Sequence, residues 1–187
     1  ILIAIENRLG LKYFAGCKED HLGDWFSGIE NYPNGGVVRT FSRKKLEKIF
    51  DACGVGERSF YYPYPDYKFM TTVYSDAYLP GRGELSNNLR NFDRDRMLLF
   101  DEKSAFDGIV EEGLFSVFSN SYLAVIGKPL DLKYVRYSND RAESFRIRTE
   151  ILRDDRGNRI VRKYPLTKEA EAHVRHMMEA YEKLKGR

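Results

Sequence analysis

The chain opens with five apolar residues, Ile1-Leu-Ile-Ala-Ile5, and the polar pair Glu6 and Asn7 ends this run. An uninterrupted apolar run of this length, closed by a turn, is typical of a strand that is buried on both faces. Such strands lie inside parallel sheets whose faces are covered by helices, so neighbouring strands are required. Nothing precedes Ile1 to supply them, and there is no initiator Met. We therefore expect the chain to be the back part of a longer protein.

The length and composition of the chain restrict the class of protein. A chain of 187 residues has room for one ordinary domain, or for a truncated domain with a small appendage. Because 31 Lys and Arg nearly balance 28 Asp and Glu, nucleic acid is not an expected partner. Cys17 and Cys53 lack CxxC spacing, and no apolar run approaches the roughly 18 residues of a membrane span. We expect a cytoplasmic protein without a membrane span.

A long loop and a helix follow the opening strand. Residues 8–36 are rich in Gly and aromatic residues, which favours a functional loop over a disordered one. Ser42 is a good helix N-cap, and Gly54 suits the left-handed position after a helix end. The apolar side chains between them recur at helical spacing, at Leu46, Ile49, Phe50 and Cys53.

The remaining patterns divide the chain near Lys128-Pro129, where the composition shifts. Before this point we expect, in chain order, a strand over 59–64, an irregular segment over 66–92, a short helix near 104–112 and a buried strand over 119–127. After it we expect strands over 134–139, 145–153 and 159–164, a hairpin turn over 154–158 and a helix from Thr167. The predicted domains are therefore residues 1–128 and an appendage over 129–187.

A resemblance to class I S-adenosylmethionine-dependent methyltransferases is carried by two segments, Ile3-Ala-Ile-Glu-Asn-Arg-Leu-Gly10 and Thr40-Phe-Ser-Arg-Lys-Lys-Leu-Glu-Lys-Ile-Phe-Asp-Ala-Cys-Gly54. In the C-terminal half of that family, a strand ending in Asn leads to a substrate-contacting loop, a helix and an antiparallel strand pair. The resemblance implies an α/β fold: a partial Rossmann-like methyltransferase sheet with antiparallel C-terminal strands, followed by a small α+β appendage. The stretch from Glu6 to Gly23 resembles methyltransferase domains of bacterial cell-surface polysaccharide biosynthesis proteins.

The resemblance also implies a reaction and its partners. It implies methyl transfer from S-adenosylmethionine to a sugar-type acceptor, a saccharide or glycolipid, with the upstream half of the same polypeptide as a partner. The family's Gly-rich loop and its ribose-binding acidic residue have no counterpart in residues 1–187. We therefore expect the chain by itself to bind the cofactor poorly and to be inactive.

The candidate catalytic residues are Asp20 and His21, which lie in the loop where such a methyltransferase meets its acceptor. Methyl transfer to a hydroxyl or carboxyl group requires removal of a proton, and His titrates near neutral pH. The alternative is a loop His that is hydrogen-bonded for structure. Glu6 and Asn7 are candidate substrate-binding residues, because open α/β sheets place ligands outside the carboxyl ends of strands. The alternative for Asn7 is a turn cap.

Three tyrosines are further candidates for acceptor binding, namely Tyr61, Tyr62 and Tyr64. Successive residues of a strand point to opposite faces, so only some of these rings can line one pocket. No spacing of His, Cys, Asp and Glu predicts a metal site.

Two other functions remain open from the sequence. The first is a non-catalytic docking module built on a degenerate methyltransferase fold. The second is the start of a kinase-like phosphotransferase lobe, because Val161-Arg-Lys163 precedes a helix that carries Glu179 and Glu182. In such lobes a strand Lys pairs with a helix Glu to hold phosphates. The alternative for Lys163 is a solvated strand residue.

Overall fold

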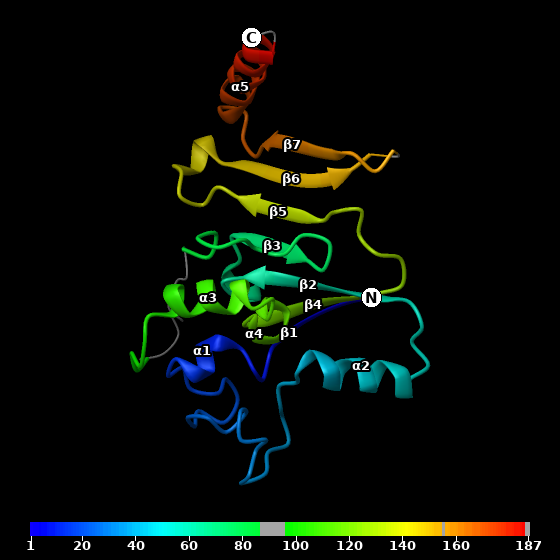
Figure 1. Cartoon of the computed structure of the whole chain (residues 1–187), viewed down its shortest axis with the longest axis vertical. Helices are drawn as coiled ribbons and strands as arrows, with labels where there is room; N and C mark the ends of the chain where they lie inside the picture. The colour runs from blue at the N-terminus through cyan, green and yellow to red at the C-terminus, as the bar shows by residue number, and fades with distance from the viewer. Residues whose placement is uncertain (87–95, 155, 186–187) are drawn as a thin grey trace. The chain divides into compact units, whose positions relative to one another are not determined.

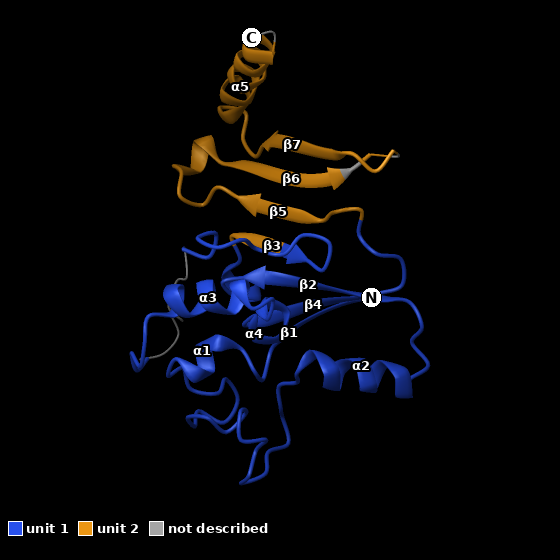
Figure 2. Ribbon diagram, viewed as in Figure 1, with its two compact units in different colours: residues 1–70, 74–130 blue, residues 71–73, 131–187 orange. Residues whose placement is uncertain are grey.

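A computed structural model of the chain describes residues 1–86, 96–154 and 156–185. Strands and helices together make the chain α/β, as expected (Figure 1). The internal contacts divide it into unit 1, residues 1–70 and 74–130, and unit 2, residues 71–73 and 131–187 (Figure 2). The sequence predicts separate domains over residues 1–128 and 129–187. Whether these two parts fold as domains is not decided by the contacts within the chain, so this boundary stays a prediction.

Three strands of unit 1 lie side by side in the order β1 (Leu2–Glu6), β4 (Ser121–Ile126) and β2 (Arg58–Tyr64). The middle strand, β4, is antiparallel to both neighbours, so β1 and β2 run in the same direction. Ala124 is the register partner of Ile3 on one side and of Phe60 on the other. The short strand β3 (Thr72–Ser75) follows β2 in the strand order, and its last residues belong to unit 1.

The opening strand is present, but the prediction that both of its faces are buried inside a parallel sheet is wrong. The side chain of Leu2 is 64% exposed, Ala4 is also exposed, and Ile3 and Ile5 are only partly covered. The strand pairs β1–β4, β2–β4, β3–β5, β5–β6 and β6–β7 are all antiparallel. A Rossmann-like parallel arrangement is therefore not found among these pairs. An apolar run of five residues fits a buried parallel strand, and it equally fits an antiparallel strand with one partly covered face.

Aromatic side chains form much of the core of unit 1. Helix α2 (Arg43–Ala52) begins after Ser42, as predicted, and packs Phe50 near Phe60 with ring centroids 6.2 Å apart. Helices α3 (Glu102–Glu111) and α4 (Phe115–Phe118) contribute one fully covered Phe each, Phe106 and Phe115. The ring of Phe115 contacts the rings of Tyr62 and Tyr74 edge-on, at centroid distances of 5.7 and 5.6 Å. Such pairs stabilise a core beyond the burial of their area.

Two segments that were expected to be irregular contain short elements. The helix α1 (Leu11–Phe14) lies in the predicted loop over 8–36. The 3-10 helix η1 (Tyr67–Phe69) and β3 lie in the segment over 66–92, of which residues 87–92 are outside the described residues. Elements of three or four residues are too short for their periodicity to be recognised in a sequence.

Unit 2 is an antiparallel meander with a terminal helix. The first residues of β3 pair with β5 (Tyr134–Tyr137), which pairs with β6 (Ile147–Arg153), and β6 pairs with β7 (Arg159–Pro165). The 3-10 helix η2 (Glu143–Phe145) lies between β5 and β6. At the predicted turn, Asp154 Oδ1 accepts hydrogen bonds from the backbone N–H groups of Arg156 and Asn158. Thr167 Oγ1 accepts a hydrogen bond from the Ala170 N–H at the start of α5 (Ala170–Lys185). The three strands, the turn and the helix expected here are confirmed.

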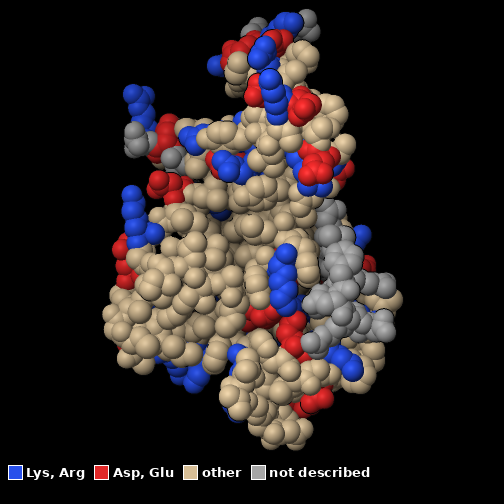
Figure 3. All heavy atoms as spheres, turned by 180° about the vertical axis from the view of Figure 1, so that it is seen from behind, with Lys and Arg blue, Asp and Glu red and all other residues tan. Residues whose placement is uncertain are grey.

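Charged side chains of both signs are interspersed on the described part of the face drawn in Figure 3, where uncharged atoms cover most of the surface. This pattern agrees with the near balance of charge in the sequence. Within residues 1–86, 96–154 and 156–185, no helix combines the length and the apolar character that a bilayer crossing requires.

Candidate functional site

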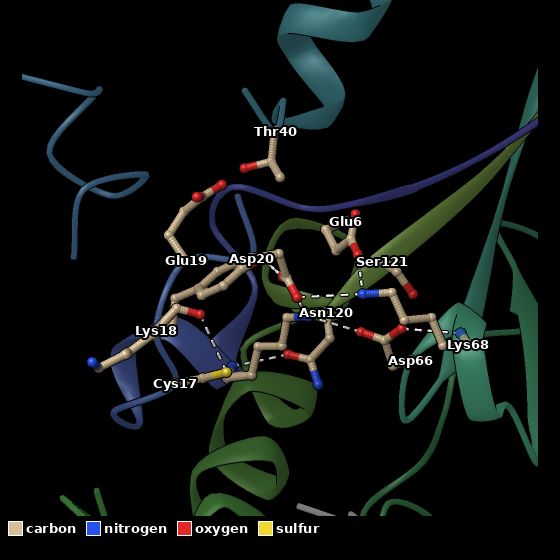
Figure 4. Close-up of polar contacts among 12 residues, drawn as sticks. Glu6, Cys17, Lys18, Glu19, Asp20, Thr40, Asp66, Lys68, Asn120 and Ser121 are labelled. Carbon is tan, nitrogen blue, oxygen red and sulfur yellow. Dashed lines mark hydrogen bonds and ion pairs between the residues drawn. The ribbon is translucent and has the colours of Figure 1, made fainter. Parts of the chain in front are cut away.

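Six polar side chains of unit 1 gather near the carboxyl end of β1 (Figure 4). They come from three separate places: the end of β1, the loop that contains α1, and the segment after β2. We call them the polar cluster, which consists of Glu6, Lys12, Tyr13, Asp20, Asp66 and Lys68.

Lys12 is the buried cation of the polar cluster. Its Nζ lies 2.9 Å from Asp66 Oδ2 and 3.2 Å from Asp20 Oδ2, and 4% of its side chain is exposed. Burial alone would lower the pKa of Lys12, but the two carboxylates outweigh it and the pKa lies above its usual value. Lys12 is therefore a charged, structurally paired group at neutral pH.

Asp20 accepts hydrogen bonds from three donors. They are the Tyr13 hydroxyl at 2.5 Å, Lys12 Nζ at 3.2 Å and Lys68 Nζ at 3.3 Å. Burial raises the pKa of Asp20, but Lys12 and the Tyr13 hydroxyl, with a contribution from Lys68, bring it below its ordinary value. The pKa of Tyr13 is raised well above its usual value by burial and then by the charge of Asp20. A carboxylate with a lowered pKa and three donors is a poor proton acceptor, so Asp20 serves as a fixed anion.

Lys68 is the member of the polar cluster that reaches solvent. Its Nζ lies 2.7 Å from Glu6 Oε1, and 31% of its side chain is exposed, against 6% for Glu6. Figure 4 draws Glu6 and Asp20 pointing toward this ammonium group. Burial lowers the pKa of Lys68, but the hydrogen bond with Glu6 and the charge of Asp20 raise it overall. A molecule in solvent would therefore meet the side chain of Lys68 first, and the ammonium group of this side chain is paired with two carboxylates.

Asn120 and Ser121, at the start of β4, bind the loop that contains Lys12 and the segment that contains Asp66 and Lys68. Asn120 Oδ1 accepts a hydrogen bond from the Lys12 backbone N–H at 2.9 Å, and Asn120 Nδ2 donates to the Pro65 carbonyl at 3.0 Å. Ser121 Oγ accepts a hydrogen bond from the Tyr67 N–H at 2.9 Å. These three bonds fix the backbone around Lys12, Asp66 and Lys68, so the ion pairs are pre-organised.

The four polar residues predicted to form the site, Glu6, Asn7, Asp20 and His21, have different surroundings in the structure. Glu6 and Asp20 belong to the polar cluster. Asn7 is fully buried, and its Nδ2 donates to the carbonyls of Val117 and Ser119, both at 2.7 Å. Asn7 therefore secures the turn, in line with its structural alternative, and is not accessible to a substrate. His21 is exposed, and its backbone N–H donates to Glu19 Oε2 at 2.8 Å.

The acceptor-binding wall expected from the tyrosines of β2 is not formed. Tyr61, Tyr62 and Tyr64 are 4%, 0% and 3% exposed, so all three rings are in the core. Their hydroxyl groups donate to the Leu130 carbonyl, to Asp76 Oδ1 and to the Leu85 carbonyl, respectively. Successive residues of β2 from Phe60 to Tyr64 are buried, so both faces of the strand are covered, and on one face Tyr62 packs against Phe115 of α4 and Tyr64 against Phe106 of α3.

Sequence reasoning missed four members of the polar cluster: Lys12, Tyr13, Asp66 and Lys68. Lys12 and Asp66 are 54 residues apart in the chain, so their pairing leaves no local pattern. The one available signal was the position of Asp66 and Lys68 directly after a predicted strand, near Pro63 and Pro65.

The described residues contain neither a cluster arranged to hold a metal ion nor the Lys–Glu pair of a kinase-like lobe. Lys163 on β7 donates to Thr149 Oγ1 at 3.3 Å, and in the described part of unit 2 it forms no ion pair with Glu179 or Glu182. Across the described residues, no group of three or more His, Cys, Asp and Glu is arranged to hold a metal ion.

Comparison of the chain with protein-family models, with curated proteins and with solved structures finds no match.

Proposed function

We propose that unit 1 is the acceptor-side part of an S-adenosylmethionine-dependent methyltransferase that transfers a methyl group to a sugar-type acceptor in bacterial surface-glycan biosynthesis. The observation that carries the proposal is the position of the polar cluster at the carboxyl end of β1, with Lys68 reaching solvent. β1 and β2 run in the same direction on either side of β4, so Glu6 and Asp66 lie at the carboxyl ends of two like-directed strands, the end at which open parallel sheets place their ligands. The order of β1, a long loop, α2 and the antiparallel strands β2 and β4 also agrees with the order that the sequence resemblance implies.

The charges of the polar cluster suit a ligand that is rich in hydroxyl groups. Three carboxylates, Glu6, Asp20 and Asp66, face two ammonium groups, so the formal charge is −1. The three carboxylates are buried and hold the two ammonium groups, so the group open to a ligand is Lys68, which donates to hydroxyl or carboxylate oxygens. A saccharide supplies both kinds of partner.

His21 is the proton acceptor in this proposal. It is next to Asp20 in the chain, its side chain is exposed, and its backbone is fixed by Glu19. The exposed imidazole of His21 can take the proton of an acceptor hydroxyl, whereas Asp20 already accepts hydrogen bonds from Tyr13, Lys12 and Lys68. Asp20 is therefore reassigned from acid/base catalysis to positioning Lys68 and the loop.

The turn after β1 does not fit the cofactor. A cofactor-binding turn after a strand needs glycines whose open space lets the backbone approach the ligand. Gly10 is the one glycine between β1 and α1, and a Cβ built on it would lie 2.9 Å from Asn120 Cα. That space is filled by the neighbouring backbone. The cofactor would therefore be held by another part of the protein, and no reaction step is assigned to it here.

Acceptor binding can be tested on the chain itself. Saturation-transfer difference NMR with methyl glycosides of hexoses, N-acetylhexosamines and hexuronic acids is expected to give signals for at least one class, with a Kd near millimolar. Lys68→Gln is expected to weaken this binding about tenfold, because a charge-assisted hydrogen bond is lost. Lys48→Gln, on the exposed side of α2, removes the same charge and is the matched control.

Two outcomes would contradict the proposal. The first is that no glycoside binds the chain, which would favour the non-catalytic docking module. The second is that Lys68→Gln and Lys48→Gln bind a glycoside equally well, which would place the sugar away from the polar cluster.

A further inference from the structure

Strand β7 and helix α5 of unit 2 border a groove with a cavity volume of about 580 Å³. Its apolar lining comes from Val161 on β7 and from one side of α5, at Val174, Met177, Met178 and Tyr181. Val161, Met178 and Tyr181 are 58%, 63% and 60% exposed, so a large part of this apolar surface faces water. Burial of this apolar surface by a ligand would be favourable, because it removes the surface from water.

The charged lining of the same groove has one sign. Arg159, Arg162 and Lys163 line it, and none of its described lining residues is a carboxylate. Arg162 Nη1 donates to the Tyr164 hydroxyl at 2.9 Å and lies 3.9 Å from Glu150 Oε2, while the other oxygen of Glu150 is 2.9 Å from Arg148 Nε. Lys163 Nζ donates to a neutral hydroxyl, Thr149 Oγ1. Glu150 is thus shared between Arg148 and Arg162, and the hydrogen bond of Lys163 leaves its positive charge uncompensated, because its partner is a neutral hydroxyl.

We propose that this groove binds a small amphiphilic anion, a molecule with an alkyl or aryl chain and a phosphate or carboxylate head group. The chain would cover Val161, Met178 and Tyr181, and the head group would lie beside the cations of β7. A volume of about 580 Å³ is within the range of roughly 300–1,000 Å³ that small-molecule sites occupy. Two methionines in the lining suit this ligand, because flexible thioether side chains adapt to apolar chains of different shape.

The four methionines of the chain provide a direct readout of binding. Met177 and Met178 line the groove, whereas Met70 and Met97 belong to unit 1. With ¹³C-methyl-labelled methionine, decyl phosphate below its micelle concentration is expected to shift the Met177 and Met178 signals and to leave the other two in place. Decanoate is expected to act similarly. Decanol, which lacks the charge, and inorganic phosphate, which lacks the chain, are expected to bind at least tenfold more weakly.

A pair of matched variants tests the role of the cations. Lys163→Glu is expected to weaken decyl phosphate binding about tenfold or more, because an attractive charge becomes a repulsive one. Lys168→Glu makes the same change at an exposed residue before α5 that does not line the groove, and it is expected to bind as the unaltered chain does.

Three results would overturn the proposal. They are equal affinity for decyl phosphate and decanol, equal effects of the two Lys→Glu changes, and equal shifts of all four methionine signals, which would indicate general detergent binding. Binding of an acidic peptide or of anionic vesicles with no response to decyl phosphate or decanoate would also reject a small amphiphile and assign the groove to a macromolecule. The glycoside experiment concerns Lys68 in unit 1, so its outcome is independent of this one.

Discussion

The ammonium group of Lys12 lies 2.9 Å from the carboxylate of Asp66, with 4% and 7% of the two side chains exposed. Lys12 is on α1 and Asp66 follows β2, so this ion pair joins the loop after β1 to the segment after β2. Removal of one partner would leave the other charge buried without compensation.

Lys12→Met is therefore expected to destabilise the chain by about 3–5 kcal/mol, because Asp66 and Asp20 would lose their shared buried cation. Lys44→Met, at an exposed residue of α2, is the control and is expected to change stability by no more than about 0.5 kcal/mol. Urea unfolding followed by circular dichroism measures both. Equal stability of the two variants would contradict a structural role for the Lys12 pairs.

The pH dependence of stability is expected to report on Asp20. Its folded-state pKa is below the ordinary value of an aspartate, since its cationic and hydroxyl partners outweigh its burial. The ionised Asp20 therefore adds to the free energy of unfolding. This contribution is fully present above the unfolded-state pKa of about 3.9, and it is lost as the pH falls through the lower folded-state pKa.

The stability difference between the unaltered chain and Asp20→Asn is thus expected to be constant from pH 7 to about pH 5 and to shrink below about pH 4. Urea unfolding at a series of pH values gives this difference directly. A difference that grows as the pH falls would show that the sign assigned to Asp20 is wrong.

Some elements were predictable because their signals are local. The helix α2 has an N-cap residue, Ser42, helical apolar spacing and a glycine, Gly54, whose φ of +70° is left-handed. The turn between β6 and β7 is similar, because Asp154 binds two backbone N–H groups within four residues. In each, the residues that determine the element are within the element or beside it.

Other features were not predictable because they depend on partners far away in the chain. The partners of β1 decide whether its apolar run is buried, and its register partner is β4, with Ile5 opposite Tyr122. The tyrosines of β2 were predicted to line a pocket, but tertiary packing covers Tyr62 completely. The polar cluster needs Lys12 and Asp66 from segments with no common motif.

Binding of S-adenosylmethionine to the 187-residue chain is expected to be weak. The sequence has no Gly-rich loop of the kind that class I methyltransferases use to bind this cofactor, and a Cβ on Gly10 would lie 2.9 Å from Asn120 Cα. Calorimetry should therefore detect no binding tighter than about millimolar, which corresponds to roughly 4 kcal/mol. A methyltransferase with a complete cofactor site, titrated in the same buffer, controls for cofactor quality. Micromolar affinity of the chain would reject the view that another part of the protein holds the cofactor.

The proposed role of His21 as proton acceptor can be tested in any protein that contains unit 1 and is found to transfer methyl groups. His21→Gln is expected to lower methyl-transfer turnover about 10²-fold or more, because the proton acceptor is lost. Its stability should stay within about 0.5 kcal/mol, since His21 is exposed. Normal turnover would return His21 to a purely structural role in the loop.

The last prediction concerns the independence of residues 129–187. In the described part of this segment, the fully buried apolar side chains are Val135, Ile147 and Ala170, which make a very small core. The segment also lacks residues 71–73 of unit 2, although Val73 is the register partner of Val135 on β5. A segment of about 60 residues buries too little surface for high stability, and the loss of an edge strand exposes the backbone of β5 as well.

We expect residues 129–187 alone to unfold with little cooperativity, whereas residues 1–187 give one dominant transition by calorimetry. A sharp, separate melting transition of the isolated segment would contradict this dependence and would favour a self-sufficient module with its own function.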